Sequence, residues 1–547
     1  MNNFEIVIFI MTILIVLSAF TDKIKLPFPI LLVGVGLVIG FVPFLPNLAL
    51  DPDIVFLIFL PPLLFDAAFK TSWLDFKKEI RPISTLAITL VFFTTTIVAV
   101  AAHYLIPGFS WPLAFVLGAI VSPPDAVAAT SITKGLGLNR KVITIIEGES
   151  LVNDASALIA YRYAVAAAIS GTFVLWEAGL QFLFVSVGGI AVGLIIGYIM
   201  VFAHKKISEN AVVETCLSLL TPFIAYLLAE RIHTSGVLAV VTAGLLISWR
   251  AREVFSFQTR LQTNVVWNTL IFLMNGLVFI LIGLQLPEIV KSFEGDRLYR
   301  IIGYGLVISL VTIVIRILWV FAGAYHQTVF KQKKPEVVDE SAPTSWKNVL
   351  IVAWTGTRGV VSLATALALP LTLQNGSPFP QRNAILLLAF IVILVTLVVQ
   401  GLTLPLLIRV LKIKPEVRQQ KQEEDDLQLN LSENTLHFID QHFTLELEDN
   451  VLQQVRRRYE FNYRMLSNKN ADNRKEQRQY ASQLNYANQL LLARSEVIKF
   501  QREILLKYHT EGTFNDETLT KYERELDIEE LQINTMMEKT EEPDSGT

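Results

Sequence analysis

Long apolar segments alternate with short polar ones over the first three quarters of the chain. Each apolar run is close to the roughly 20 residues that a helix needs to cross the hydrocarbon core of a bilayer. After Leu411 the sequence changes to one rich in Gln, Glu, Lys and Arg. We therefore expect an all-α polytopic membrane domain over 1–411 and a separate helical tail over 412–547.

The pattern predicts about thirteen membrane spans. Composition supports this interpretation, because the 547 residues are 52% hydrophobic and only 17% charged, which is too apolar for a soluble domain. The predicted spans are 4–20, 28–48, 53–69, 83–106, 112–133, 143–169, 175–203, 212–230, 235–249, 264–286, 298–323, 349–371 and 383–411.

Basic residues divide unequally between alternate loops. The loops near 21–27, 70–82, 134–141, 204–211, 250–262 and 324–348 hold 18 Lys and Arg residues, whereas the intervening loops hold 5. The positive-inside rule places the basic loops in the cytoplasm. We therefore expect a protein of the cell membrane with its N-terminus outside and its tail inside, as an odd number of spans requires.

Several motifs of other protein classes do not occur in the sequence. The single cysteine, Cys216, lies in an apolar run, so no disulfide framework is expected. We find no zinc-ligand spacing and no Gly-rich phosphate loop, which argues against an ATP-driven pump. We predict a protein with no cofactor and no nucleic-acid partner. The N-terminus has neither a basic n-region nor a small-residue cleavage site, so we interpret it as a retained first span.

The tail holds 19 basic and 27 acidic residues. Segments 488–508 and 515–533 space their apolar residues as amphipathic helices do, and the second begins with residues that favour a helix N-cap. These features predict a helical bundle that packs on itself or on a second subunit, with binding of a regulator as an alternative.

Two spans carry signals for an interrupted helix. The fifth reads "SPPDAVA", where Pro123 and Pro124 remove two backbone donors, so we expect a break beside Asp125. The twelfth reads "TGTRG", with Arg358 among glycines and threonines. Broken backbone is tolerated at membrane depth where it lines a cavity or is buried in protein. Each break is fifth in a half of six spans (1–6 and 8–13), which is typical of inverted-repeat secondary transporters with a midplane site.

The sixth span contains "EGESLVNDASALIA", a cluster of polar groups that starts a long apolar helix. Ser150 and Asp154 are four residues apart and share a helix face, as do Glu149 and Asn153. Hydroxyl, carboxylate and carbonyl oxygens are suitable ligands for a hard cation. The alternative for Glu147 and Glu149 is a position in the headgroup region, favoured by the helix dipole.

A carboxylic acid at Asp154 would be deep enough in the membrane to retain its proton near neutral pH, since burial favours the neutral form. If the same oxygens bind a cation, proton and cation compete for one site. Competition of this kind couples the two fluxes and predicts antiport. The third span places another acid, Asp66, after the Pro pair of "FLPPLLFDAAF".

These motifs, together with "NGLVFILIGLQLP", are similar to those of a known family. The chain resembles the sodium/proton exchangers of the monovalent cation:proton antiporter-1 family over about 1–411, especially bacterial members with long cytoplasmic tails. The resemblance implies a homodimer in which a core domain (spans 3–6 and 10–13) slides against a dimerisation domain (spans 1–2 and 7–9).

The resemblance also implies roles for individual residues. Asn153 and Asp154 form the transport centre, and Asp154 is the carboxylate shared by proton and cation. Relatives with Asn-Asp here are generally electroneutral, exchanging one cation for one proton. The further implied positions are Ser150 as a hydroxyl ligand, Asp125 as the broken-helix acid, Asp66 as a nearby third-span acid and Glu149 as an important acid. Sodium is expected at Asp154, Asp125 and Ser150.

The chain departs from the family at two places. The Pro pair precedes Asp125, so the break is shifted and Pro124 replaces a common Thr. The tenth span carries Asn268 where the family commonly has a Glu that pairs with Arg358. Because an unpaired Arg358 would be costly in the membrane, either Asn268 and backbone carbonyls bind it or another acid, Glu147 or Glu149, does. We favour a structural role for Arg358.

The predicted function is that of a Na⁺(Li⁺)/H⁺ antiporter that serves pH homeostasis. A K⁺/H⁺ exchanger is the close alternative, and a cation channel is a less favoured one. An intramembrane hydrolase using Asp66, Asp125 and Asp154 is disfavoured by the surrounding cation-ligand set. Arg162 and Arg316 also lie within spans; Arg162 could pair with an acid and is assigned no role.

Overall fold

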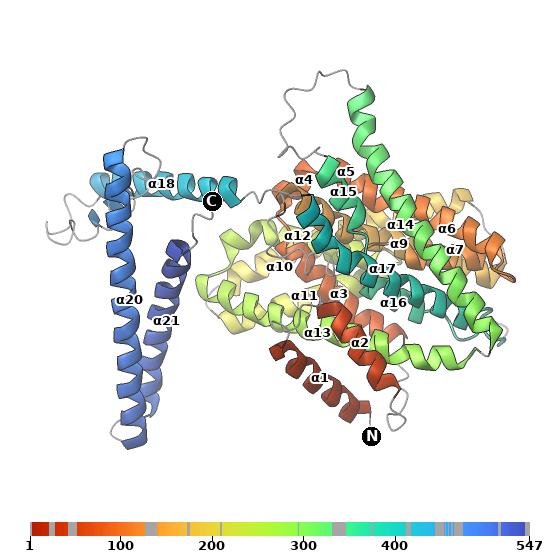
Figure 1. Cartoon of the computed structure of the whole chain (residues 1–547), viewed down its shortest axis with the longest axis horizontal. Coiled ribbons are helices and arrows are strands. Elements are labelled where there is room, and N and C mark those ends of the chain that lie inside the picture. The colour runs from red at the N-terminus through yellow and green to blue at the C-terminus, as the bar shows by residue number, and fades with distance from the viewer. Residues whose placement is uncertain are drawn as a thin grey trace. The chain divides into compact units, whose positions relative to one another are not determined.

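The computed structural model describes most of the chain (Figure 1). The described residues are 3–20, 28–41, 52–125, 138, 140–171, 175–207, 210–293, 295–330, 346–373, 376–411, 417–442, 474–511 and 516–541, with six single positions between 453 and 463. Over these residues the regular structure is helical, and extended pairing is confined to one isolated bridge between Thr372 and Pro378.

The chain divides into two compact units, residues 1–416 and 417–547. Within the described part of the first unit, six helical stretches are long and apolar enough to cross a membrane, and four shorter apolar helices accompany them. Helices suit these sequences because each satisfies its own backbone hydrogen bonds where no water is present. The predicted all-α polytopic membrane fold is confirmed, while the number of spans stays a prediction.

The first unit consists of two groups of helices, defined by which helices pack most extensively on one another. We name the first the crossing group. It contains α4 (Trp73–Lys78), α5 (Ile80–Ser84), the π-helical turn η2 (Thr85–Leu90), α6 (Val91–Leu105), α7 (Trp111–Val121), α9 (Arg140–Ser170), α14 (Asp296–Phe330), α15 (Trp346–Trp354), α16 (Val360–Leu367) and α17 (Arg382–Val410).

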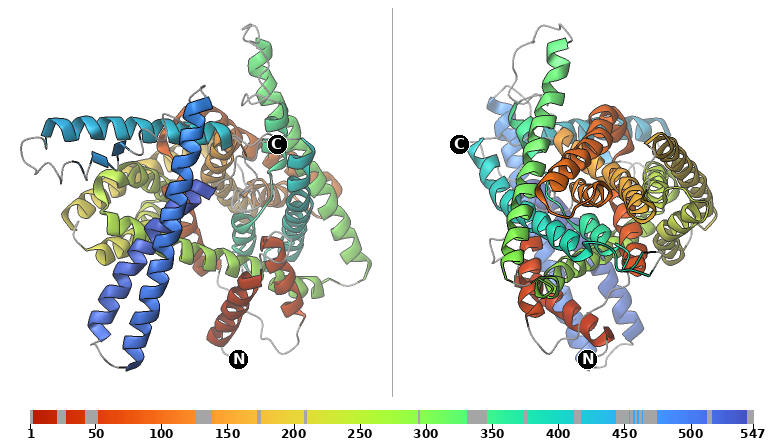
Figure 2. Two further views of the ribbon diagram at one scale, coloured as in Figure 1. Left: turned by 60° about the vertical axis from the view of Figure 1, so that its left-hand side comes forward. Right: turned by 90° about the vertical axis from the view of Figure 1, so that its right-hand side faces the viewer.

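The second group, the scaffold group, has its largest interfaces between α2 and α13 and between α10 and α12 (Figure 2). It contains α1 (Asn3–Phe20), α2 (Phe28–Gly40), α3 (Pro52–Lys70), α10 (Leu175–Ile207), α11 (Ala211–Arg231), α12 (Gly236–Val254) and α13 (Phe257–Lys291). Helix α3 packs mainly on α12, and α13 mainly on α2. The division into a core domain (spans 3–6 and 10–13) and a dimerisation domain (spans 1–2 and 7–9) stays a prediction.

Both predicted interruptions are confirmed. Helix α7 ends at Val121, and residues 122–125 are not helical; the second half of this predicted span, 126–133, lies outside the described residues. Residues 355–359 separate α15 from α16 in the same way. In contrast, α3 continues through its own pair of prolines at 61 and 62.

Two glycines allow α2 and α13 to approach closely. A Cβ atom at Gly36 would overlap the backbone carbonyl of Ile280, and one at Gly283 would overlap that of Val33. Small residues of this kind let membrane helices approach until their backbones are in contact. Van der Waals packing then holds the helices together, because the hydrophobic effect does not favour helix association in lipid.

The second unit contains α18 (Val417–His442), α20 (Arg474–Glu511) and α21 (Asp516–Glu541). The two amphipathic segments expected in the tail lie within α20 and α21. Leu491, Ile498, Leu526 and Ile533 are buried between these helices. Arg494 pairs with Glu529 at 2.7 Å, and ion pairs of Arg502 add to the same interface.

We predict that Gly36→Leu destabilises the membrane unit, because the added side chain must separate α2 from α13. Overpacking of this kind typically costs about 1–3 kcal/mol. The matched control is Gly34→Leu, two residues away, where no atom lies within 4 Å of a new Cβ. Thermal unfolding in detergent, followed by tryptophan fluorescence, should show a lower midpoint only for Gly36→Leu. Equal midpoints for both variants would contradict the close packing.

Candidate functional site

The two broken helices meet through their backbones. The amide of Asp125 donates to the carbonyl of Thr357 at 2.6 Å, and the hydroxyl of Thr357 donates to the carbonyl of Asp125 at 3.1 Å. Groups that the prolines and glycines remove from helical hydrogen bonding are therefore satisfied by the opposite break. This mutual pairing makes non-helical backbone tolerable at membrane depth.

The Asp125 carboxylate also caps α16. The amide of Val360 donates to Oδ2 at 3.2 Å, at the helix end where the dipole favours a negative charge. Gly359 makes this approach possible, since a Cβ there would overlap the carboxylate. The predicted broken-helix acid thus orders the beginning of α16.

The sixth-span pair lies against the same crossing. The side-chain amide of Asn153 donates to the carbonyl of Pro124 at 3.0 Å, and Asn153 is fully buried. Asp154 follows it on α9, is 6% exposed, and is close enough to Asp125 for the two charges to interact. Ser150 lies one turn earlier and is half-buried. The structure therefore brings Asn153, Asp154 and Asp125 together.

Arg358 is held by backbone carbonyls at the ends of the broken helices. Its Nε donates to the carbonyl of Val121 at 3.0 Å, and its other guanidinium nitrogens donate to the carbonyls of Ser122 and Gly356. Val121 and Ser122 end α7, where the helix dipole favours a positive charge. Of the predicted alternatives, the structure has backbone carbonyls as the direct ligands of this guanidinium.

Asn268 lies elsewhere, and this corrects the proposed pairing with Arg358. It is exposed on α13 and accepts a hydrogen bond from Lys70 at 2.9 Å. Lys70 also forms an ion pair with Asp66 at 2.8 Å. Asp66 is therefore paired with a lysine four residues further along α3, and its Oδ1 atom is buried without a hydrogen-bond partner in the described part of the chain.

Arg316 is the important residue that the sequence interpretation missed. It forms a buried, two-pronged ion pair with Glu149, at 2.5 and 2.8 Å, and donates to the carbonyls of Val352 and Thr355 at the end of α15. Bidentate pairs of this kind are among the strongest charge-assisted hydrogen bonds. The available signal was a mid-span arginine in the eleventh span, which needs an acid at membrane depth.

Glu149 thus interacts with both buried arginines, with Arg316 through direct hydrogen bonds and with Arg358 through electrostatic attraction at longer range. Its charge acts on Arg358 as well as on its direct partner Arg316. Gly356 lets the two guanidinium groups approach, since a Cβ there would meet the side chains of both. We name Glu149, Arg316 and Arg358 the clasp, because together they bind the ends of α7 and α15 to α9.

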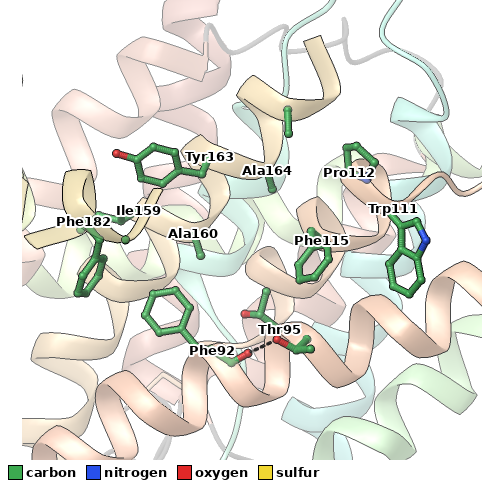
Figure 3. Close-up of a pocket in the computed structure, with 13 residues that line it drawn as sticks. Phe92, Thr95, Trp111, Pro112, Phe115, Ile159, Ala160, Tyr163, Ala164 and Phe182 are labelled. Carbon is green, nitrogen blue, oxygen red and sulfur yellow. Dashed lines mark hydrogen bonds between the residues drawn. The ribbon is translucent and has the colours of Figure 1, made fainter. Parts of the chain in front are cut away.

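A separate cavity of about 690 Å³ lies between α6, α7, α9 and α10 (Figure 3). Its lining is almost entirely apolar and includes Phe92, Phe115, Ala164 and Phe182. None of the predicted cation ligands lines it, so this cavity is distinct from the crossing. Among the residues that the structure describes, no group of three His, Cys, Asp or Glu side chains could hold a metal ion.

Comparison with known proteins supplies the family. The model described as "Sodium/hydrogen exchanger, transmembrane" matches residues 8–410. A sodium, potassium, lithium and rubidium/proton antiporter of Bacillus pumilus is 34% identical over 70% of the chain; the matched region spans 58% of that relative's length. An uncharacterized sodium/proton exchanger of Mycobacterium bovis is 31% identical over 92% of the chain and 91% of its own length.

A solved structure has the same fold. The sodium proton antiporter of Methanocaldococcus jannaschii aligns with a TM-score of 0.56 at 19% identity, covering 74% of this chain and 97% of its own. At that level of identity the likeness concerns the fold alone.

We predict that Arg316→Met destabilises the protein by about 3–5 kcal/mol, because it leaves the Glu149 carboxylate buried without its partner. Adding Glu149→Gln should recover part of the loss, since no buried charge then remains. The control pair is Arg250→Met with Glu253→Gln, an exposed ion pair on α12 expected to contribute at most about 1 kcal/mol. Tryptophan-monitored thermal unfolding measures all variants; similar midpoints for Arg316→Met and Arg250→Met would refute the clasp.

Proposed function

The chain belongs to the sodium/hydrogen exchanger family, and from this premise we propose that it is a secondary-active antiporter that exchanges sodium for protons. The observation that supports this most directly is the position of Asn153 and Asp154 against the crossing of two broken helices. Membership of a family described as transmembrane sodium/hydrogen exchangers supports transport as the proposed activity.

The cation site of the proposal is built from oxygens around Asp154. Asp154 supplies the exchangeable negative charge, Ser150 a hydroxyl one turn away, and the break beside Asp125 carbonyl oxygens. Asn153 positions that break through Pro124. Its own side-chain oxygen is buried without a hydrogen-bond partner among the described residues, so it is available as a further neutral ligand. Such a set suits a small alkali cation.

Coupling follows from sharing one carboxylate. Protonated Asp154 is neutral, and Asp154 with a bound Na⁺ is also neutral, so both forms can remain in a dry site. The ionised, empty form carries the full desolvation cost of a buried charge. The site therefore moves between the two sides of the membrane only when loaded, and one cation is exchanged for one proton without net charge.

The clasp has a positioning role in this scheme. It neutralises the carbonyl ends of α7 and α15 without occupying Asp154. Glu149 is therefore proposed as a partner of Arg316 that fixes α9 against the breaks, in place of its expected role as a cation ligand. Asp66 is proposed to act through its ion pair with Lys70 rather than at the cation.

The ion preference is proposed as sodium first, with lithium also accepted. The name of the Bacillus relative includes potassium and rubidium as well, so a K⁺/H⁺ exchange activity is the alternative to measure beside it. The proposed assembly is a homodimer in the cell membrane, surrounded by lipid, with the N-terminus outside. The tail is proposed to lie in the cytoplasm and to bind itself, its twin subunit or a regulator.

We predict that Asp154→Asn abolishes exchange, because the amide neither carries the charge nor titrates. Purified protein in vesicles with an imposed pH gradient should release the quenching of a pH dye when Na⁺ is added; the variant should match empty vesicles. The control is Asp296→Asn, an exposed acid at the start of α14 that should keep the unaltered rate. Full exchange by folded Asp154→Asn would exclude the shared carboxylate.

We predict that the sodium concentration for half-maximal exchange rises as the pH falls, approaching tenfold per pH unit once protons occupy the site. The direction follows because protons and sodium compete for one ionised carboxylate, so cation binding requires deprotonation. Saturating sodium should restore the rate at moderately low pH. The dye assay, repeated with Na⁺, Li⁺, K⁺ and Rb⁺ at several pH values, measures both the pH dependence of half-saturation and the ion preference. A half-saturation value that does not change with pH would contradict the competition.

A further inference from the structure

An ion pair joins the two helix groups at a distance from the transport centre. Arg162 lies on α9 eight residues after Asp154, which is about 12 Å along the helix axis. One nitrogen of its guanidinium donates to both carboxylate oxygens of Glu230, at 2.9 and 3.0 Å. Glu230 lies in the last turn of α11. The pair therefore connects the helix that carries Asn153 and Asp154 to the scaffold group.

The neighbouring part of this boundary is loosely packed. The face of α9 that contains Ala160, Tyr163 and Ala164 borders the cavity shared with α10 (Figure 3). The cavity lies between this face of α9 and Gly179 and Phe182 of α10, and Phe182 contacts Phe92 of α6 on its far side. Because the cavity separates this face of α9 from α10, the ion pair with Glu230 is a direct link between this end of α9 and the scaffold group.

Glu230 is held in place by a second contact within the scaffold group, whereas the Arg162 side chain is partly exposed to solvent. Glu230 accepts a second hydrogen bond, from the amide of Gly236 at 3.3 Å. A Cβ at Gly236 would press on the ring of Tyr226, so glycine is required for this arrangement. The Arg162 side chain is 47% exposed and that of Glu230 28% exposed. A pair with this exposure is weak enough to open and reform.

We propose that Arg162 and Glu230 form a latch, which holds the Ser170 end of α9 to the scaffold group in one state of the transport cycle and opens in the other. The inference rests on the proposed antiport function, because alternating access requires the two groups to move relative to one another. A contact of 2.9 Å does not survive a displacement of several ångströms. The latch changes the ratio of the populations of the two states by a few-fold, so both states remain populated.

The first test restrains the latch covalently. Arg162→Cys and Glu230→Cys are combined with Cys216→Ser, which removes the exposed native thiol, and a cleavable bifunctional methanethiosulfonate joins them. Exchange of sodium for protons in vesicles should fall at least tenfold and return after reduction. The control is Arg250→Cys with Glu253→Cys, one turn apart on α12, where the same reagent should change nothing. Unaltered exchange by fully cross-linked protein would overturn the latch.

The second test uses charge. Arg162→Gln and Glu230→Gln should each change the half-saturating sodium concentration on the Ser170 side by about 3- to 10-fold, without a change in thermal midpoint. Exchanging the two residues, Arg162→Glu with Glu230→Arg, should return the value to within twofold. A double exchange whose half-saturating sodium concentration lies no closer to the wild-type value than that of either Gln variant would reject the latch. Wild-type protein without any sodium-driven proton movement would count against the proposed function instead, so the two failures are distinguishable.

Discussion

The membrane unit depends on satisfying the backbone of two broken helices where no water is available. Two consecutive prolines in one span and two glycines in another release amides and carbonyls at membrane depth. The breaks pair with each other through Asp125 and Thr357. Charged side chains satisfy the remaining ends: Asp125 at the start of α16, and Arg358 and Arg316 at the ends of α7 and α15.

The acidic residues of the membrane unit have different partners in the structure, although the sequence alone does not distinguish them. Asp125 and Glu149 each have an ordering partner, an amide in one case and a guanidinium in the other. Asp66 has a lysine. Asp154 is the buried acid that lies beside the crossing next to the Asn153 contact with Pro124. An acid that stabilises structure cannot change its charge freely, whereas one that transports ions must, so separating these roles suits exchange.

The sequence predicted the parts of the fold that follow from local chemistry. Apolar runs, the proline pair and the glycines around Arg358 indicated membrane helices and both breaks, and the four-residue spacings grouped the polar face of α9. Contacts between side chains on different helices could not be predicted from local sequence in this way. Which acid meets Arg316, and where the amide of Asn268 points, depend on how α9, α13 and α14 pack. That packing also places α3 mainly against α12 and α13 mainly against α2.

Helix α9 unites three kinds of contact on one rigid element. Glu149 fastens it to the broken helices, Asn153 and Asp154 place it at the crossing, and Arg162 reaches the scaffold group. From Glu149 to Arg162 is about 20 Å along the axis. The clasp joins α9 to the broken helices, and Arg162 joins its other end to the scaffold group. In the proposed antiport cycle, sliding between the groups would therefore act on the ion pair of Arg162, while the contacts of Asn153 would stay within the crossing group.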